Sequence, residues 1–257
     1  MKILLLFILF IIGCNETYEE KNIYGFNFIK IKDKKNIFFI MKNEVTVAQY
    51  INYLNKSLKE KKIRLEKNKD TYNNLAVVGY YGGDEKYQIG TPYHYYKKGE
   101  KIYIYLEGEI MTPYIIYDEI LNLFKIRNNE FKKHPITRIS WFGAHAFGEF
   151  YNLKLPTDNQ WTKSARYITE NKNLEMDLIL KKSNIKTDVI KSVDDFDFYG
   201  NVSEWTKSLW ETPKSSFRAI KGGSCFDYND KYFNLNYKKS NFATQILKDV
   251  GFRLVKN

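Results

Sequence analysis

The chain has 257 residues, of which 44% are hydrophobic and 17% aromatic, so it contains enough apolar material to build a buried core. This composition excludes an intrinsically disordered protein, a small disulfide-stabilised protein and a polytopic membrane protein. The formal net charge is +11, carried mostly by lysines that are scattered along the whole chain. Because no arginine-rich arm or zinc-finger spacing accompanies them, we expect a solvated basic surface and no nucleic-acid partner.

The first residues have the features of an export signal. Lys2 precedes an apolar run from Ile3 to Ile12, which Gly13 and Cys14 close. The run is about half of the roughly 20 residues that a membrane-spanning helix needs, and it is typical of a secretory signal peptide. Its end resembles the bacterial lipobox, in which the signal is removed before a cysteine that then carries lipid. The alternative is an ordinary signal peptide that happens to contain a cysteine.

The lipobox resemblance divides the chain into three parts. It implies a signal peptide over residues 1–13, a Cys14 that carries acyl chains such as palmitate, and a spacer that completes residues 14–25. Several acyl chains anchor a protein stably, so we expect a lipoprotein whose partner is the membrane itself. Its location would be the cell envelope, at the outer membrane or the periplasmic face if the cell is Gram-negative. Cys225 is the remaining cysteine and would have no disulfide partner, so stability must come from packing.

In chain order, the first predicted elements are strands and a helix. Alternation of apolar residues over 26–31 and the apolar run over 37–41 predict strands. Thr46 and Gln49 form a capping box, and an apolar stripe follows them as far as Leu58, which predicts a helix. The highly charged residues 59–75 predict the end of that helix and a surface loop. A turn at residues 98–101 precedes an alternating strand over 102–106.

Two further helices are predicted in the second half. Ser140 can cap a helix that begins at Trp141, and Thr157 with Gln160 forms a second capping box before a helix that carries Trp161. No internal repeat and no proline- or serine-rich linker divides the chain. The simplest interpretation is one mixed α+β domain over residues 26–257.

Short motifs between residues 44 and 255 follow one another in an order that is typical of one known family. They are Glu-Val-Thr at 44–46, His-Pro at 134–135, Ser-Trp at 140–141, Leu-Pro-Thr at 155–157, Trp161 with Ala165 and Arg166, Gly-Asn-Val at 200–202 with Glu204 and Trp205, Gly-Gly-Ser at 222–224, and Gly-Phe-Arg at 251–253. Together they resemble the formylglycine-generating enzyme (sulfatase-modifying factor) family. The resemblance implies an α+β domain with a C-type-lectin-like fold and much irregular structure.

The resemblance also implies a chemistry that this chain lacks the residues to perform. Family enzymes oxidise a sulfatase cysteine with oxygen and a copper ion held by two cysteines, three and eight residues after the serine of Gly-Gly-Ser. Here these positions are Asp227 and Tyr232. Monovalent copper prefers soft thiolates, and a carboxylate and a phenol are hard ligands. We therefore expect no copper and a pseudoenzyme.

A structural calcium ion is the cofactor that the resemblance makes most plausible. Carried over from the family, its ligands would be the carboxylates of Asp197 and Glu204 and the backbone carbonyls of Gly200 and Val202. Calcium binds several hard oxygens of this kind in a compact loop. The alternative is that Asp197 is a turn residue and Glu204 a helix cap or a surface charge.

The remaining candidates leave two functions open. Cys225 is either a small buried residue or a reactive thiol, and His94, His134 and His145 are too few for the iron centre of a second branch of the family. The first hypothesis is a binding or scaffolding role toward an unknown envelope protein or a glycan, for which the many tyrosines could supply a surface. The alternative is a divergent oxidoreductase that acts on a protein cysteine or a small molecule through Cys225.

Overall fold

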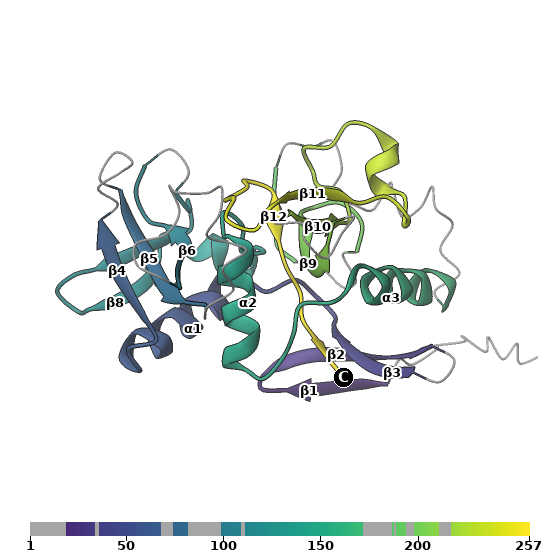
Figure 1. The fold of residues 1–257 in the computed structure, drawn as a ribbon, viewed down its shortest axis with the longest axis horizontal. Coiled ribbons are helices and arrows are strands. Elements are labelled where there is room, and N and C mark those ends of the chain that lie inside the picture. Colours follow the sequence, from purple (N-terminus) through teal and green to yellow (C-terminus); the bar gives the residue numbers. More distant parts are fainter. Residues whose placement is uncertain are drawn as a thin grey trace, which may run out of the picture.

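The computed structural model describes most of the chain. The described residues are 19–33, 36–67, 74–81, 99–108, 111–171, 187, 189–193, 198–210 and 217–257. Within these ranges the chain forms three α-helices, two 3-10 helices and four small β-sheets (Figure 1). The helices are α1 (Val47–Lys59), α2 (Trp141–Phe150), α3 (Asp158–Asn171) and the 3-10 helices η3 (Asn129–Lys133) and η4 (Asp230–Phe233).

The two ends of the domain meet in one antiparallel sheet. Its order is β1 (Glu20–Ile23), β2 (Phe26–Asp33), β3 (Asn36–Met41) and β13 (Val255–Lys256). The C-terminal strand β13 pairs with β3, with Val255 opposite Ile40. The last residues of the chain therefore close the sheet that the first described residues begin.

Three more sheets complete the fold. The first has the order β4 (Ile63–Lys67), β5 (Leu75–Tyr80) and β6 (Glu100–Tyr105), and the second is the hairpin of β7 (Ile115–Asp118) and β8 (Leu123–Ile126). The third has the order β11 (Lys239–Phe242), β10 (Phe217–Lys221), β9 (Ser203–Leu209) and β12 (Val250–Gly251). In this sheet β12 runs parallel to β9, whereas the other pairs are antiparallel.

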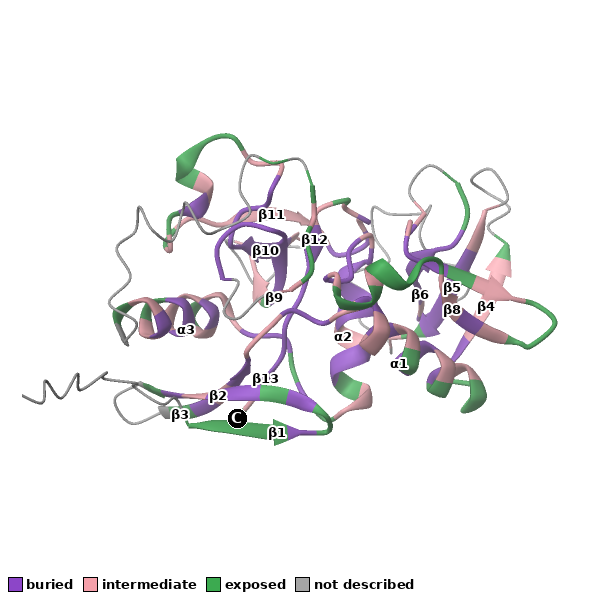
Figure 2. Ribbon diagram, turned by 180° about the vertical axis from the view of Figure 1, so that it is seen from behind, coloured by how far each residue is buried: buried purple, intermediate pink, exposed green. Residues whose placement is uncertain are grey.

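The elements are arranged around the central helix α2. Figure 1 shows the β4–β5–β6 sheet with α1 at one end of the molecule and the β9–β12 sheet with α3 at the other. Strands β1–β3 lie along one side, beneath α2 and α3 in this view. Figure 2 shows that β1 is exposed along most of its length, while β9 and β10 are largely buried.

The main core lies where α1 and α2 cross. The ring of Phe147 stacks on Tyr50 at 5.7 Å and meets Phe252 edge-on at 5.4 Å. Gly143 allows this close approach, because a Cβ atom there would come within 2.8 Å of the Tyr50 hydroxyl and 3.0 Å of the Tyr103 carbonyl. A larger residue would therefore overpack the contact between α2 and its neighbours.

All three predicted helices are present and begin at the predicted caps. Thr46 and Gln49 make the reciprocal capping box of α1. The Ser140 hydroxyl accepts from the Gly143 amide at 3.1 Å at the start of α2. At α3 the Thr157 hydroxyl accepts from the Gln160 amide, and the Gln160 side chain accepts from the Thr157 amide. The α+β fold class is likewise confirmed.

Two segments differ from the sequence-based expectation. The charged segment 59–75, expected to be a helix end and a loop, contains strand β4, because Ile63 is buried and Leu65 is half-buried while Arg64 pairs across the sheet with Glu100. Strand β1 lies within residues 14–25, which were expected to be a spacer; it forms a hairpin with β2 across the turn at Tyr24. The sequence analysis predicted no strand in residues 115–126, which form the hairpin β7–β8.

None of the helices in the described residues is both long enough and apolar enough to span a membrane.

Candidate functional site

Several of the family-like motifs meet at the fully buried side chain of Arg253. Its guanidinium makes two charge-assisted hydrogen bonds to Glu204, from Nε to Oε2 and from Nη2 to Oε1, both at 2.8 Å. The indole Nε1 of Trp161 donates to the same carboxylate at 2.9 Å. Such bidentate pairs are among the stronger hydrogen bonds in proteins.

The rest of the guanidinium is satisfied by the N-terminal part of the chain. Nη1 donates to the carbonyls of Met41 and Lys42, at 3.2 and 2.9 Å. The carboxylate of Glu44 lies 3.5 Å from Nη2, and the ring of Phe198 packs on the guanidinium at 3.8 Å. We call Glu44, Trp161, Glu204 and Arg253 the buried ion network.

This network assigns a structural role to four motifs. Burying a charge costs free energy unless the charge is paired and fully hydrogen-bonded, and here the Arg253 donors Nε, Nη1 and Nη2 all have acceptors. Its members join β9, α3, the C-terminal segment and the segment before α1. In this chain the four motifs therefore hold together segments that are far apart in sequence.

The Gly-Gly-Ser motif forms a tight buried turn. Gly222 and Gly223 have positive φ angles of 97° and 70°, and a Cβ at Gly223 would lie 2.7 Å from the ring of Phe233. Only glycine adopts this backbone without strain. The next residue, Ser224, is fully buried, and its hydroxyl donates to Asp249 at 2.7 Å.

The position of the family's first copper ligand is used to hold this turn. The Oδ2 atom of Asp227 accepts a hydrogen bond from the Ser224 amide at 2.8 Å and lies 3.1 Å from the Ser224 hydroxyl, whose single proton it shares with Asp249. The same oxygen forms an ion pair with Lys239 at 2.7 Å. Tyr232 occupies the position of the second ligand, and its ring packs against that of Tyr237. The Lys239 ammonium lies 5.2 Å from the centre of the Tyr232 ring. A fixed ammonium beside both positions disfavours a metal cation.

Cys225 is buried in the same turn. Its side chain is 0% exposed, and its amide donates to the Asn201 carbonyl at 3.0 Å. The interpretation of a small buried residue therefore matches the structure, whereas a reactive thiol needs an accessible sulfur.

The described part of the predicted calcium site does not fit a calcium ion. Glu204 gives both oxygens to the buried ion network, so a calcium ion there would compete with the Arg253 guanidinium at 2.8 Å. Gly200 and Val202 are buried in the preceding loop, and Asp197 lies outside the described residues. Within the described residues, no three His, Cys, Asp or Glu side chains are grouped so as to hold a metal. The alternatives of a helix cap or a surface charge are wrong for Glu204, which is a buried strand residue.

The other predicted site residues do not come together. Cys14 and His94 lie outside the described residues. His134 packs against the rings of Tyr114 and Phe131, whereas His145 packs against those of Trp141 and Tyr81. The two described histidines thus have separate aromatic surroundings.

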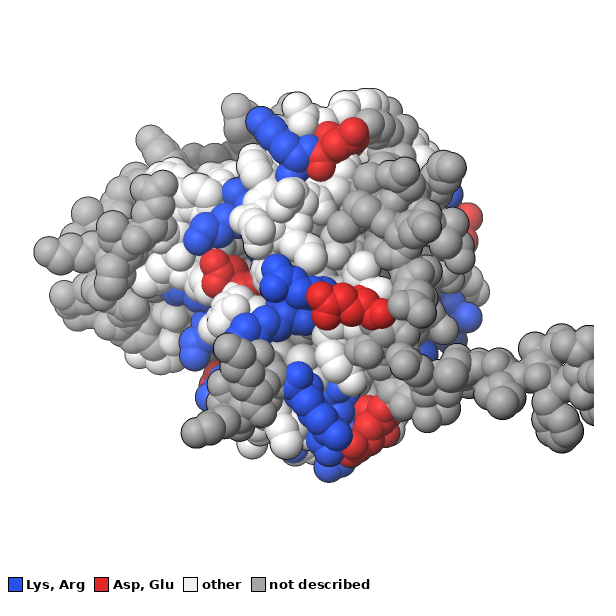
Figure 3. Space-filling view, turned by 90° about the vertical axis from the view of Figure 1, so that its right-hand side faces the viewer, with Lys and Arg blue, Asp and Glu red and all other residues white. Residues whose placement is uncertain are grey.

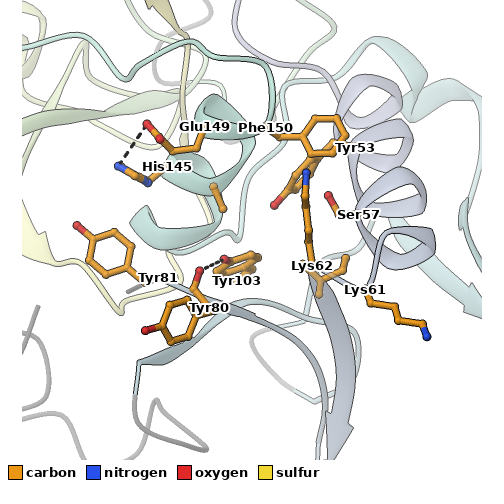
Figure 4. Close-up of a pocket in the computed structure, with 12 residues that line it drawn as sticks. Tyr53, Ser57, Lys61, Lys62, Tyr80, Tyr81, Tyr103, His145, Glu149 and Phe150 are labelled. Carbon is orange, nitrogen blue, oxygen red and sulfur yellow. Dashed lines mark hydrogen bonds and ion pairs between the residues drawn. The ribbon is translucent and has the colours of Figure 1, made fainter. Parts of the chain in front are cut away.

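A cavity of about 480 Å³ lies between α1, α2 and the β4–β5–β6 sheet (Figure 4). Aromatic side chains dominate its walls. They are Tyr53, Tyr80, Tyr81, Tyr103 and Phe150. Polar groups interrupt these walls at Ser57 and at His145 with Glu149, whose side chains approach to 4.0 Å.

Burial controls the ionisation of the groups in this cavity. It lowers the pKa of His145, although the Glu149 carboxylate opposes this effect, so the imidazole is neutral at pH 7. Burial also raises the pKa of Tyr103, whose hydroxyl donates to the Tyr80 carbonyl at 3.5 Å. His145 and Tyr103 are therefore neutral hydrogen-bonding groups, whereas the charged residues that line the cavity are Lys61, Lys62 and Glu149.

Sequence reasoning did not find this cavity. The tyrosine-rich composition of residues 75–110 was the available signal, and Tyr103 had been assigned only to a strand. Tyr53 and His145 reach the cavity from two helices that are distant in sequence. A cavity between non-local elements has no local sequence pattern.

Comparison with known proteins gives one family and a set of similar folds. The sulfatase-modifying factor enzyme 1-like domain family matches residues 29–257. Among solved structures, CarF is similar with a TM-score of 0.51 and 16% identity, covering 93% of this chain and 96% of that chain. Variable protein 1 of Treponema denticola and PvdO from Pseudomonas aeruginosa are also similar, with TM-scores of 0.43 and 0.41 and identities of 13% and 11%. The match to variable protein 1 covers 89% of this chain and 98% of that chain, and the match to PvdO covers 88% of this chain and 97% of that chain.

The likeness to CarF supports the fold alone, whereas the family match extends over nearly all of the described domain. The resemblance inferred from the motifs is thus confirmed. The chain belongs to the family of sulfatase-modifying factor enzyme 1-like domains.

Proposed function

We propose that this protein is a binding member of its family, held in the cell envelope by lipid on Cys14, and that it does not form formylglycine with copper. The observation that carries the proposal is that Asp227 occupies the position of a copper ligand and is already bound to Ser224 and Lys239. Where a copper thiolate would stand, a carboxylate caps the Ser224 turn and pairs with Lys239. The thiol nearest in sequence, Cys225, is fully buried.

The oxidase hypothesis has a direct test. We would incubate the full chain in detergent with copper(I), oxygen and a peptide that carries the sulfatase cysteine motif, and search for the aldehyde product by mass spectrometry. A competent oxidase of the family serves as positive control. We expect no aldehyde. Aldehyde that disappears in Cys225→Ser would overturn the proposal and establish the divergent oxidoreductase instead.

The anchoring part of the proposal rests on the sequence around Cys14. Acyl chains contribute about 0.8 kcal/mol per buried CH₂, so a lipidated chain should partition into a detergent phase. We expect the wild type to label with radioactive palmitate and enter the detergent phase, and Cys14→Ala to do neither. Export of an unlabelled wild type would show an ordinary signal peptide.

The charge of the protein is compatible with an envelope location. Removal of residues 1–13 takes away Lys2 as the one charged residue and leaves a formal charge of +10. Figure 3 shows one face on which lysine and arginine side chains lie beside acidic ones without forming a continuous basic patch. Such a surface suits weak contacts with anionic lipid or wall polymers.

A further inference from the structure

We propose that the cavity between α1, α2 and the β4–β5–β6 sheet binds a neutral saccharide. This inference rests on the proposed binding function and names its ligand class. It concerns a site apart from the family-like motifs at Asp227 and Tyr232, because every residue that lines the cavity lies between residues 53 and 150.

The size and rigidity of the cavity favour a small molecule. Its volume of about 480 Å³ lies within the range of roughly 300–1,000 Å³ that is usual for small-molecule sites. Tyr53, Ser57 and Tyr103 line it and are at most 3% exposed, so packing holds them in place. An extended peptide would require an open groove along a strand or helix.

The chemistry of the walls fits a sugar ring. A pyranose has apolar C–H faces and a rim of hydroxyl groups. The rings of Tyr80, Tyr81 and Phe150, which are exposed or half-buried, offer apolar surfaces. The hydroxyls of Tyr80 and Tyr81 and the side chains of His145 and Glu149 offer hydrogen-bond donors and acceptors at the edges. A wholly apolar ligand would remove water from these polar groups without replacing its hydrogen bonds, which costs about 1–3 kcal/mol for each group.

The charges around the cavity favour a ligand without net charge. The Lys62 ammonium pairs with Glu60 at 2.7 Å and lies 4.8 Å from the ring centre of Phe150, in the wall of the cavity. A cationic ligand beside this wall would be repelled by the ammonium group. Figure 4 shows Lys61 at the outer edge, directed away from Tyr103. An anion would meet the carboxylate of Glu149 and a neutral His145.

The test compares neutral and charged sugars on the full chain in detergent. We would titrate glucose, galactose, mannose and N-acetylglucosamine, with glucosamine and glucuronate as charged counterparts, and measure binding by calorimetry and saturation-transfer NMR. We expect at least one neutral sugar to bind, and both charged sugars to bind more weakly than their neutral relatives. Binding by none of the neutral sugars, or tighter binding of glucuronate, would overturn the inference.

Matched variants locate the binding. Tyr81→Ala should lower the affinity for the sugar by about tenfold, and Glu149→Gln should lower it several-fold. Tyr228 and Glu119 are exposed and lie outside the cavity, so Tyr228→Ala and Glu119→Gln should leave the affinity unchanged. Tyr81→Phe keeps the ring and should retain most of the affinity, which controls for a folding defect. Equal binding by the wild type and Tyr81→Ala would place the sugar elsewhere and refute the site.

The outcomes for the two proposals are separable. If no sugar binds and no aldehyde forms, the saccharide inference fails and the binding function without oxidase activity is retained. If sugar binds at the cavity and aldehyde also forms, the inference holds and the proposed function fails. The aldehyde assay depends on the region of Asp227, which contributes nothing to the cavity.

Discussion

Arg253 shows how one charged residue can belong in a protein core. Its guanidinium is enclosed by Glu204, the carbonyls of Met41 and Lys42, and the ring of Phe198. Each contact replaces part of the hydration that the charge loses on burial. A smaller or neutral residue at this position would be destabilising, because the Glu204 carboxylate would remain buried without its cation.

We predict that Arg253→Met destabilises the protein by about 3–5 kcal/mol, since it leaves the Glu204 carboxylate buried without its cation. Urea unfolding followed by circular dichroism measures this loss. The double variant Glu204→Gln/Arg253→Met should lose less than the sum of the single variants, because it removes both charges.

The matched control for this prediction is Lys30→Met. Lys30 pairs with Glu19, which is 60% exposed, and surface pairs contribute about 0–1 kcal/mol. Its loss should therefore be small. A cost for Arg253→Met as small as that of Lys30→Met would contradict the structural role of the buried ion network.

Lys221 gives the stability of the protein a dependence on pH. Burial lowers its pKa to about 8, with Lys238 acting in the same direction and Asp158 opposing. In an unfolded chain the pKa of lysine is about 10.4. Between these values the unfolded state holds a proton that the folded state has released, so stability rises with pH in this interval.

The expected result is that the unfolding free energy of the wild type rises relative to that of Lys221→Met between about pH 8 and pH 10. The comparison of the two proteins cancels the titration of the many tyrosines. Chemical denaturation at a series of pH values measures the difference in unfolding free energy between the two proteins. Lys132→Met, at an exposed position, is the control. A difference that stays constant with pH would show that Lys221 does not titrate in this range.

At the scale of elements, the helices follow from local chemistry and the strands much less so. The caps at Thr46, Ser140 and Thr157 satisfy helix-terminal amides with side chains only three residues away. Strand β4 instead depends on β5, which begins eight residues after β4 ends. Residues 63–67 do alternate between apolar and charged residues, but this short run lies in a highly charged segment. Arg64 pairs there with Glu66 and, across the sheet, with Glu100.

We expect Thr46→Ala to destabilise the protein by about 1 kcal/mol, because the Gln49 amide loses its acceptor at the start of α1. Thermal unfolding measures the loss. Thr46→Ser keeps the hydroxyl and should retain most of the stability, so equal destabilisation by the two substitutions would show that the capping hydrogen bond is not the cause. Since α1 carries Tyr53 and Ser57, the sugar-binding assay reports whether the cap also positions the cavity.

At the scale of the whole molecule, the C-terminal segment joins distant parts of the fold through strand β13 and through the buried ion network. Strand β13 completes the first sheet, and Arg253, two residues before it, joins segments that are 49 and 211 residues away in sequence. This closure uses hydrogen bonds and ion pairs between protein groups.

We therefore predict that removal of calcium does not lower the melting temperature. Differential scanning fluorimetry with EGTA and with millimolar calcium should give the same transition, because Glu204 is already paired with Arg253. A lower transition in EGTA that Glu204→Ala abolishes would instead establish the calcium site that the family resemblance implied, and would require Arg253 to release the carboxylate.

The sequence alone determined where the helices begin, the mixed fold class and the family. Caps and apolar stripes act between residues three or four apart, and the order of motifs such as Gly-Gly-Ser at 222–224 is a property of the chain itself. Only the tertiary structure decided what those motifs do. Glu204, which the resemblance assigned to calcium, pairs with Arg253, and Tyr53 and His145 line one cavity. These residues lie far apart in the chain, and no local pattern encodes which of them come together.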